Sequence, residues 1–292
     1  MIAKAISEQP GAVTPAVMPG RQFGRFALQA LLSKSLVTLM WLAFDPSTGN
    51  EVMLAMPRHP PPDKRSLEHW HRQARLAARL NHPQLAMVLE IGQQNQYPFM
   101  TWERKQGITL AERLLNQPAP TAIEVAAWVC QALEGLAFAH EAGMAHRDLQ
   151  LPFLLVNAAD QLRVCGIALA PSLEPAEALQ RSMDTDSLHR QREAAEADLL
   201  SMGVLMHRLL SAAWPFDEPD VQIVLSQIPP RGRDLVHLPW TTPHPVAEPL
   251  RAIANRATDR QVPRRYRSAR TWLYALNGWR TSAARDDGGP IG

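Results

Sequence analysis

The pattern of apolar residues changes type once along the chain, and this change constrains the fold more than any other feature. Residues 36–43 are rich in strand formers, a strong turn cluster fills residues 45–50, and an apolar run resumes over residues 51–56. From Thr109 onward, apolar residues recur mostly at helical spacing. The chain therefore predicts an α+β protein with two lobes, a β-rich front and a helical back.

The β-rich front is expected to contain one helix. A proline cluster at residues 60–62 breaks the chain, and Asp63 or Ser66 can then cap a helix that runs to Leu80. Two further strands are expected, over residues 85–91 and 98–102.

Four long helices are expected in the back of the chain. Thr121 and Glu124 form a capping box ahead of an apolar helix to about Ala142. Ser268 can cap a last helix that runs to Trp279. The other two are expected over residues 198–210 and 246–257.

The ends of the chain are expected to be flexible. Residues 1–21 mix Ala, Pro, Gly and Val without a period, and residues 282–292 are rich in Asp and Gly. The folded domain is therefore predicted over residues 22–281, with a front lobe over residues 22–103 and a back lobe over residues 104–281.

Composition argues against several classes of protein. Hydrophobic residues make up 46% of the chain, which allows a large core, and a net charge of +2 without a basic run gives no case for nucleic acid. No segment approaches the roughly 18 uninterrupted apolar residues of a membrane span, and no apolar core follows Lys4 as in a secretory signal. Cys130 and Cys165 lie in apolar contexts. We therefore expect a cytoplasmic protein with two buried thiols, and the histidine spacing predicts no metal site.

A short motif adds a second constraint, because residues 146–149 read His-Arg-Asp-Leu after an apolar helix and before an apolar run. Further landmarks occur in the order of the family, at residues 45–49, 80–83, 100–103, 198–205, 214–216 and 265–269. Together they resemble the bacterial Ser/Thr protein kinases over roughly residues 23–279. The resemblance implies a two-lobed protein-kinase-like fold, with a small β-rich N-lobe and a larger α-helical C-lobe.

The resemblance also implies an ATP site, but the residues that bind phosphate are absent. The family covers the phosphates with a glycine-rich loop and pairs a strand lysine with a helix glutamate. Ser33, Ser35 and Thr38 stand in the glycine-rich loop, Ala55 replaces the lysine, and Gln73 replaces the glutamate.

The positions that bind magnesium in the family are also changed. Phe153 stands where the catalytic-loop Asn is expected, and Gln150 where the loop lysine is expected. At family spacing the metal Asp corresponds to Gly166, and an alignment shifted to residues 164–166 contains no Asp either. We therefore expect no bound metal.

Bulky side chains are expected to fill the adenine side of the cleft. Met53 stands where the family has a small alanine, and Trp102 falls at or beside the position that gates the pocket behind adenine. The region to inspect is the space between Met40, Met53, Trp102 and Leu155.

The retained family residues are interpreted mainly as structural. Asp148 is a vestigial or residual catalytic base. We expect His146 to pack in the core and Arg147 to join the loop network. By the resemblance, Asp198 accepts hydrogen bonds from the catalytic-loop backbone, and Arg265 has a structural role.

Residues 171–197 are expected to form a polar activation segment. Asp186 is a candidate partner for Arg265. Ser182, Thr185 and Ser187 are either phosphate acceptors for another kinase or ordinary loop hydroxyls.

Two functions follow from the resemblance, and the missing charges favour the one that is not an enzyme. The first is a pseudokinase, a regulatory or scaffolding module that binds an unidentified protein partner without a cofactor. The alternative is an atypical ATP-dependent Ser/Thr protein kinase that uses Asp148 with magnesium, with Lys34 or an arginine replacing the strand lysine. A third role is binding of a non-nucleotide ligand.

Candidate docking surfaces are a helix face with Arg72, Arg75 and Arg79 and an N-terminal arm with several prolines. A solvated helix face and a disordered arm explain these features equally well. The prolines of the arm are Pro10, Pro15 and Pro19.

Overall fold

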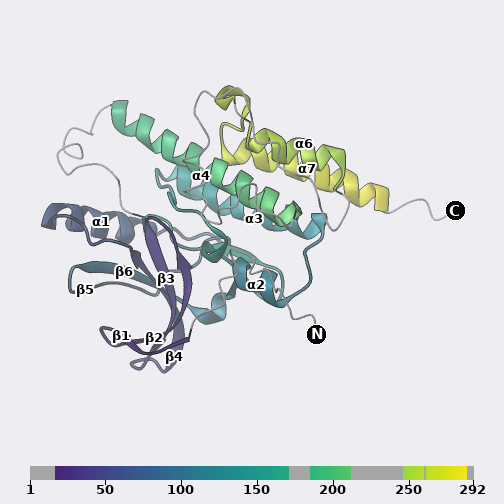
Figure 1. Ribbon diagram of the computed structural model, residues 1–292. Helices are drawn as coiled ribbons and strands as arrows, with labels where there is room; N and C mark the ends of the chain where they lie inside the picture. Colours follow the sequence, from purple (N-terminus) through teal and green to yellow (C-terminus); the bar gives the residue numbers. More distant parts are fainter. Residues whose placement is uncertain (1–16, 171–184, 212–245, 260, 288–292) are drawn as a thin grey trace, which may run out of the picture.

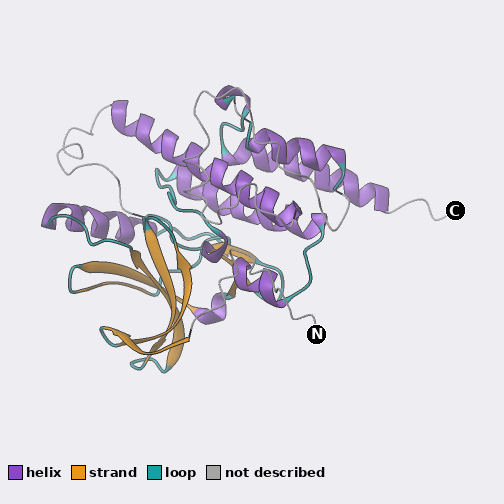
Figure 2. Cartoon of the chain, in the orientation of Figure 1, coloured by secondary structure: helices purple, strands orange, loops and turns teal. Residues whose placement is uncertain are grey.

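The computed structural model describes residues 17–170, 185–211, 246–259 and 261–287. A small lobe of antiparallel strands with one helix adjoins a larger lobe of helices (Figure 1). Figure 2 shows strands almost only in the first lobe and long helices mainly in the second. The predicted α+β class with two lobes is therefore confirmed.

The small lobe is built on one antiparallel sheet with strand order β1-β2-β3-β4-β6-β5. The predicted turn at residues 45–50 joins two of its strands, because Gly49 adopts a φ of 68° and its amide donates to the Asp45 carbonyl at 2.9 Å. The strands are β1 (Val17–Phe23), β2 (Phe26–Lys34), β3 (Thr38–Asp45), β4 (Asn50–Pro57), β5 (Glu90–Gln94) and β6 (Tyr97–Glu103).

The single long helix of the small lobe, α1 (Lys64–Ala77), lies beside β5 and β6. Asp63 caps it, since its carboxylate accepts a hydrogen bond from the amide of Ser66 at 2.7 Å. The strand predicted over residues 85–91 is wrong in its first half, because β5 begins at Glu90. The preceding backbone instead bonds to the large lobe, with the Ala86 amide donating to the Val164 carbonyl at 2.8 Å.

The large lobe is organised around one apolar helix, α3 (Ala122–Glu141), which starts at the predicted Thr121 and Glu124 capping box. Among the described helices, α3 alone is long and apolar enough to cross a membrane, but 61% of its apolar window is buried inside the protein, as in an ordinary core helix. The other elements are β7 (Ile108–Thr109), α2 (Leu110–Asn116), β8 (Leu154–Val156), β9 (Leu162–Val164), α4 (Thr185–Ser211), α6 (Glu248–Ala257) and α7 (Ala269–Asp287).

Regular structure extends further than predicted at three places. Strand β1 pairs with β2 from Val17, so the flexible arm predicted up to residue 21 is too long. Helix α7 continues to Asp287, so the tail predicted from residue 282 is also too long. Helix α4 begins at Thr185 instead of residue 198, because residues 185–197 contain neither Gly nor Pro and are rich in helix formers.

Part of the predicted activation segment lies outside the described residues. This applies to residues 171–184, including Ser182, and to the side chains of Thr185, Asp186 and Ser187. The landmark at residues 214–216 is outside them as well.

Candidate functional site

Apolar side chains fill the space between the two lobes. Met40, Met53, Trp102 and Leu155 are all completely buried, and they belong to one hydrophobic cluster. This cluster joins β2, β3, β4, β6 and α1 of the small lobe to β8 and the loops around β8 and β9 of the large lobe. Its other buried members are Leu32, Ala55, Trp70, Ala74, Ala86, Met100, Phe153, Cys165 and Leu169.

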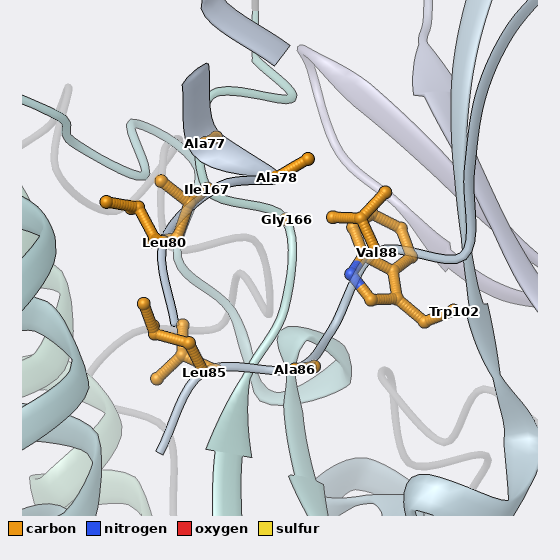
Figure 3. A pocket seen from close by; sticks show the side chains of 10 residues that line it. Ala77, Ala78, Leu80, Leu85, Ala86, Val88, Trp102, Gly166 and Ile167 are labelled. Atoms are coloured by element: carbon orange, nitrogen blue, oxygen red, sulfur yellow. The ribbon is translucent and has the colours of Figure 1, made fainter. Parts of the chain in front are cut away.

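A small pocket remains behind Trp102, between the end of α1 and the segment that follows β9 (Figure 3). Its volume of about 10 Å³ suits about one water molecule, whereas ligand pockets usually measure hundreds of Å³. The indole nitrogen of Trp102 faces this pocket and has no hydrogen-bond partner among the described residues. The pocket has no room for a nucleotide.

Hydroxyl groups from the β2–β3 turn close over Asp148, which is 1% exposed. Its carboxylate accepts hydrogen bonds from Ser35 Oγ at 2.8 Å, Thr38 Oγ1 at 2.5 Å and Gln150 Nε2 at 2.7 Å. Ser33 Oγ in turn donates to Gln150 Oε1 at 3.4 Å. We call these five residues the latch. A catalytic base would have to accept a hydrogen bond from a substrate hydroxyl, and here the hydroxyls of Ser35 and Thr38 take that place on the carboxylate of Asp148.

Asp198 holds the backbone of the loop that carries Asp148. Its two carboxylate oxygens accept hydrogen bonds from the amides of His146 and Arg147, both at 2.7 Å, and His140 Nε2 lies 2.9 Å from one of them. Arg147 has a φ of 67°, a left-handed conformation that costs free energy in a non-glycine residue. This is the contact expected of Asp198, and it stabilises the loop whether or not the loop catalyses a reaction.

The imidazole of His146 is a buried structural group. Burial lowers its pKa, so the ring is neutral at physiological pH. Its Nε2 donates to the Cys165 carbonyl at 2.8 Å, which leaves Nδ1 to accept from the Asp148 amide at 3.4 Å. Burial also raises the pKa of the Cys165 thiol. Neither the imidazole of His146 nor the thiol of Cys165 is therefore suited to general acid–base catalysis.

At the two positions that bind magnesium in the family, this chain has the phenyl ring of Phe153 and a glycine, Gly166, that faces it. Phe153 is fully buried, and its ring contacts that of His146 edge to face, with 4.9 Å between centroids. A β-carbon on Gly166 would lie 2.7 Å from Phe153 Cδ1. Within the described part of the chain, no cluster of three His, Cys, Asp or Glu residues could hold a metal. The residues present do not fit magnesium or a magnesium-bound nucleotide.

Helix α1 is attached to the large lobe by a hydrogen bond from a buried indole. Trp70 Nε1 donates to the Leu169 carbonyl at 2.8 Å, three residues beyond Gly166. Ala55 is completely buried, and Gln73 is half-buried without a hydrogen bond from its side chain among the described residues. The indole of Trp70 therefore holds α1 against the large lobe, while the positions of the family's Lys–Glu pair within the small lobe carry no charge.

Two other predicted site residues lie away from the cleft or point out of it. Arg265 Nε donates to the Asp259 carbonyl in the large lobe. Its proposed pairing with Asp186 falls on a side chain outside the described residues. Lys34 is exposed at the end of β2, on the opposite side of the strand from the buried Ser33 and Ser35.

Sequence reasoning found the positions of the latch but missed their contacts. Gln150 was visible only as a substituted lysine, and the hydroxyls of Ser35 and Thr38 only as missing glycines. The available signal was the residue type: Ser35, Thr38 and Gln150 can donate hydrogen bonds, and they stand at positions that surround a phosphate in the family. Nothing in the sequence indicated the bond from Trp70.

The protein kinase domain family matches residues 43–271. The chain is 25% identical to the serine/threonine-protein kinase PknL of Mycobacterium tuberculosis over 73% of its length. It is 29% identical to the DNA damage-responsive serine/threonine-protein kinase RqkA of Deinococcus radiodurans over 90% of its length. It is 24% identical to the probable serine/threonine-protein kinase pknA2 of Bifidobacterium longum over 66%. The matches span 59%, 41% and 27% of these three relatives, respectively.

Proposed function

Since this chain belongs to the protein kinase family, we propose that it is a catalytically impaired member, a pseudokinase, that acts as a regulatory or scaffolding module by binding another protein. The observation that carries this proposal is the filled cleft. Met40, Met53, Trp102 and Leu155 occupy the space where the family binds adenine, and none is exposed.

The chemistry of phosphoryl transfer supports the same conclusion. Its transition state is stabilised by positioned charges, and removing a single stabilising group of this kind often costs on the order of 10²–10³ in rate. Here Ala55 and Gln73 provide no charge, and Phe153 and Gly166 provide no metal ligand. Such losses are not additive, but together they leave little with which to bind or activate ATP.

Thermal unfolding with and without magnesium and ATP tests the proposal. A ligand at 100 times its Kd adds about 2.7 kcal/mol to the free energy of unfolding. For a domain of this size, that corresponds to a rise in Tm of about 5–10 °C. We expect millimolar magnesium and ATP together to shift the Tm by no more than magnesium alone does. A reproducible rise of several degrees that requires the nucleotide would overturn the filled-cleft proposal.

One observation favours an atypical Ser/Thr protein kinase as the second candidate. Asp148 is retained in an ordered loop, and the relatives named above are described as serine/threonine-protein kinases. Transfer of radiolabelled phosphate by the wild type and by Asp148→Asn separates the two functions. Label transferred by the wild type and lost in the variant would establish the enzyme; we expect neither protein to transfer label.

A further inference from the structure

The outer face of α1 carries a strip of arginines that no function described so far explains. Arg72, Arg75 and Arg79 are exposed, and Leu76 between them is 47% exposed. We call these four residues the α1 strip. Arg72, Arg75 and Leu76 lie on α1, and Arg79 lies in the turn that follows it. Helix α1 lies on the side of the small lobe nearest the large lobe (Figure 1), and its buried face, with Trp70 and Ala74, packs into the cluster between the lobes, opposite the α1 strip.

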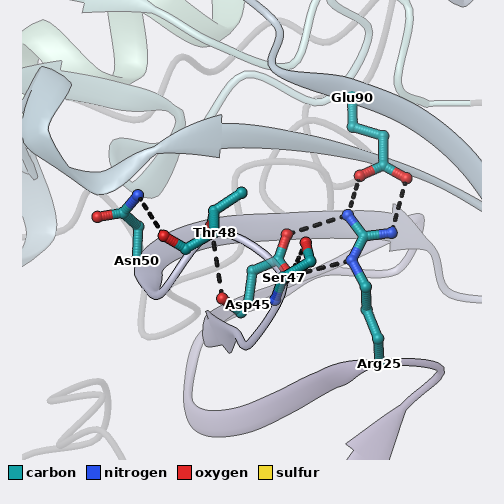
Figure 4. A network of polar contacts seen from close by, with 6 residues as sticks. All are labelled: Arg25, Asp45, Ser47, Thr48, Asn50 and Glu90. Atoms are coloured by element: carbon teal, nitrogen blue, oxygen red, sulfur yellow. Dashed lines mark hydrogen bonds and ion pairs between the residues drawn. The ribbon is translucent and has the colours of Figure 1, made fainter.

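The arginines of the α1 strip have no acidic partner among the described residues. Glu68 is the sole acidic residue of α1, and its carboxylate lies 3.8 Å from Lys64 Nζ. On the neighbouring strand β5, Glu90 pairs with Arg25 of the small lobe instead (Figure 4). The α1 strip therefore presents three positive charges that pair with no acid in the described part of the chain, while Glu68 and Glu90 pair with other cations.

The spacing of the α1 strip places its members on one surface. Positions i, i+3 and i+4 of a helix share a face, which groups Arg72, Arg75 and Leu76. Arg79 follows in the turn after α1, so the strip extends over about 10 Å of chain. Arginine binds carboxylates through two parallel hydrogen bonds, and a half-exposed leucine adds apolar contact at the centre. We propose that the α1 strip docks an acidic amphipathic helix of a protein partner, with carboxylates facing the arginines and an apolar residue against Leu76. This names the partner class of the pseudokinase proposed above and rests on that function.

Nucleic acid suits the α1 strip less well than an acidic helix. The net charge of the chain is only +2, so the whole molecule carries little of the positive charge that is typical of a nucleic-acid-binding domain. Affinity for nucleic acid depends on neutralising many phosphates, and a strip of about 10 Å reaches few of them. Leu76 at its centre would lose its apolar contact against a phosphate backbone.

A designed peptide tests the docking proposal without nucleotide present. The probe is a fluorescein-labelled, alanine-based helix with Glu at positions i, i+3 and i+7 and Leu at i+4. A peptide of the same composition in scrambled order is the control. We expect fluorescence anisotropy to show saturable binding of the probe at 50 mM salt, weakened at 300 mM. The scrambled peptide should bind at least about fivefold more weakly, because its acids no longer share one face.

Charge reversal locates the binding surface. Arg72→Glu with Arg79→Glu should weaken binding at least tenfold, whereas Arg264→Glu with Arg267→Glu, which changes the net charge equally on the large lobe, should change it less than twofold. Leu76→Ser keeps every charge and should weaken binding about threefold. Each protein is first shown to retain the wild-type Tm within about 2 °C, and Leu76→Ser decides the matter if the double variant does not fold.

Three results would overturn the docking proposal. The first is that the probe does not bind the wild type saturably. The second is that both charge-reversed proteins lose the same affinity for the probe. The third is that a 15-base-pair DNA duplex binds more tightly than the probe. The experiment is independent of the cleft. A shift in Tm with magnesium and ATP would overturn the filled-cleft proposal and leave the peptide result standing, and a peptide that fails to bind says nothing about the nucleotide.

Discussion

Replacing Gly166 by alanine probes how completely the metal position of the family has been closed. Gly166 has a φ of 87°, where a side chain costs about 1–2 kcal/mol. The added β-carbon would also lie 2.7 Å from Phe153 Cδ1 and 3.2 Å from His146 Nε2. Overpacking a buried site typically costs a further 1–3 kcal/mol. We expect Gly166→Ala to lower the free energy of unfolding by about 2–5 kcal/mol.

A second glycine separates the two contributions. Gly49 has a φ of 68°, but nothing lies within 4 Å of a β-carbon built on it. Gly49→Ala should therefore cost only the backbone strain, about 1–2 kcal/mol. The difference between the two variants measures the clash with Phe153. In a double-mutant cycle, Phe153→Leu should recover most of that difference.

Urea denaturation followed by tryptophan fluorescence and circular dichroism measures the stability of the wild type and the four variants. A Gly166→Ala variant that is no less stable than Gly49→Ala would refute the claim that Phe153 closes the metal position. Failure of Phe153→Leu to couple with Gly166→Ala would place the strain elsewhere.

Three further substitutions are expected to lower the stability of the fold by stated amounts. The hydrogen bond from Arg25 lowers the pKa of Asp45 from 3.8 to about 2, so the contribution of Asp45 to stability is complete above pH 4 and disappears as the pH falls through 2. Arg25→Met should cost about 1–2 kcal/mol at pH 7 and flatten the dependence of stability on pH between 4 and 2, measured by urea denaturation. Asp198→Ala should cost about 3 kcal/mol or more, because two buried amides lose their acceptor, and equilibrium unfolding measures this loss. Trp70→Phe should cost about 1 kcal/mol and lower the Tm by about 2–4 °C in calorimetry, because the Leu169 carbonyl loses its donor.

Local features of the fold could be predicted from the sequence because their causes are local. The turn before β4 depends on Asp45 and Gly49, and the starts of α1 and α3 depend on Asp63 and Thr121, each bonding to a residue no more than four positions away. The early start of α4 at Thr185 was missed because a polar segment resembled a loop, although its helix propensity was high.

The candidate site could be predicted only as a set of substitutions. The sequence showed that Ser35 and Thr38 replace glycines and that Phe153 replaces a metal ligand. It did not show that both hydroxyls bond to Asp148, because that contact joins residues more than 100 positions apart. Pairings of this kind depend on how the lobes pack, and no local propensity specifies them.

The buried cluster between the lobes has a consequence for how the protein unfolds and moves. Two lobes that share a solvent-filled cleft can rock about a hinge and can lose their structure separately. Here Met53 and Trp102 of one lobe and Phe153 and Leu155 of the other belong to one continuous apolar core. Separating the lobes would expose that core to water, so we expect the two lobes to move together as one rigid body. Calorimetric and van't Hoff enthalpies should then agree, as for one cooperative unit.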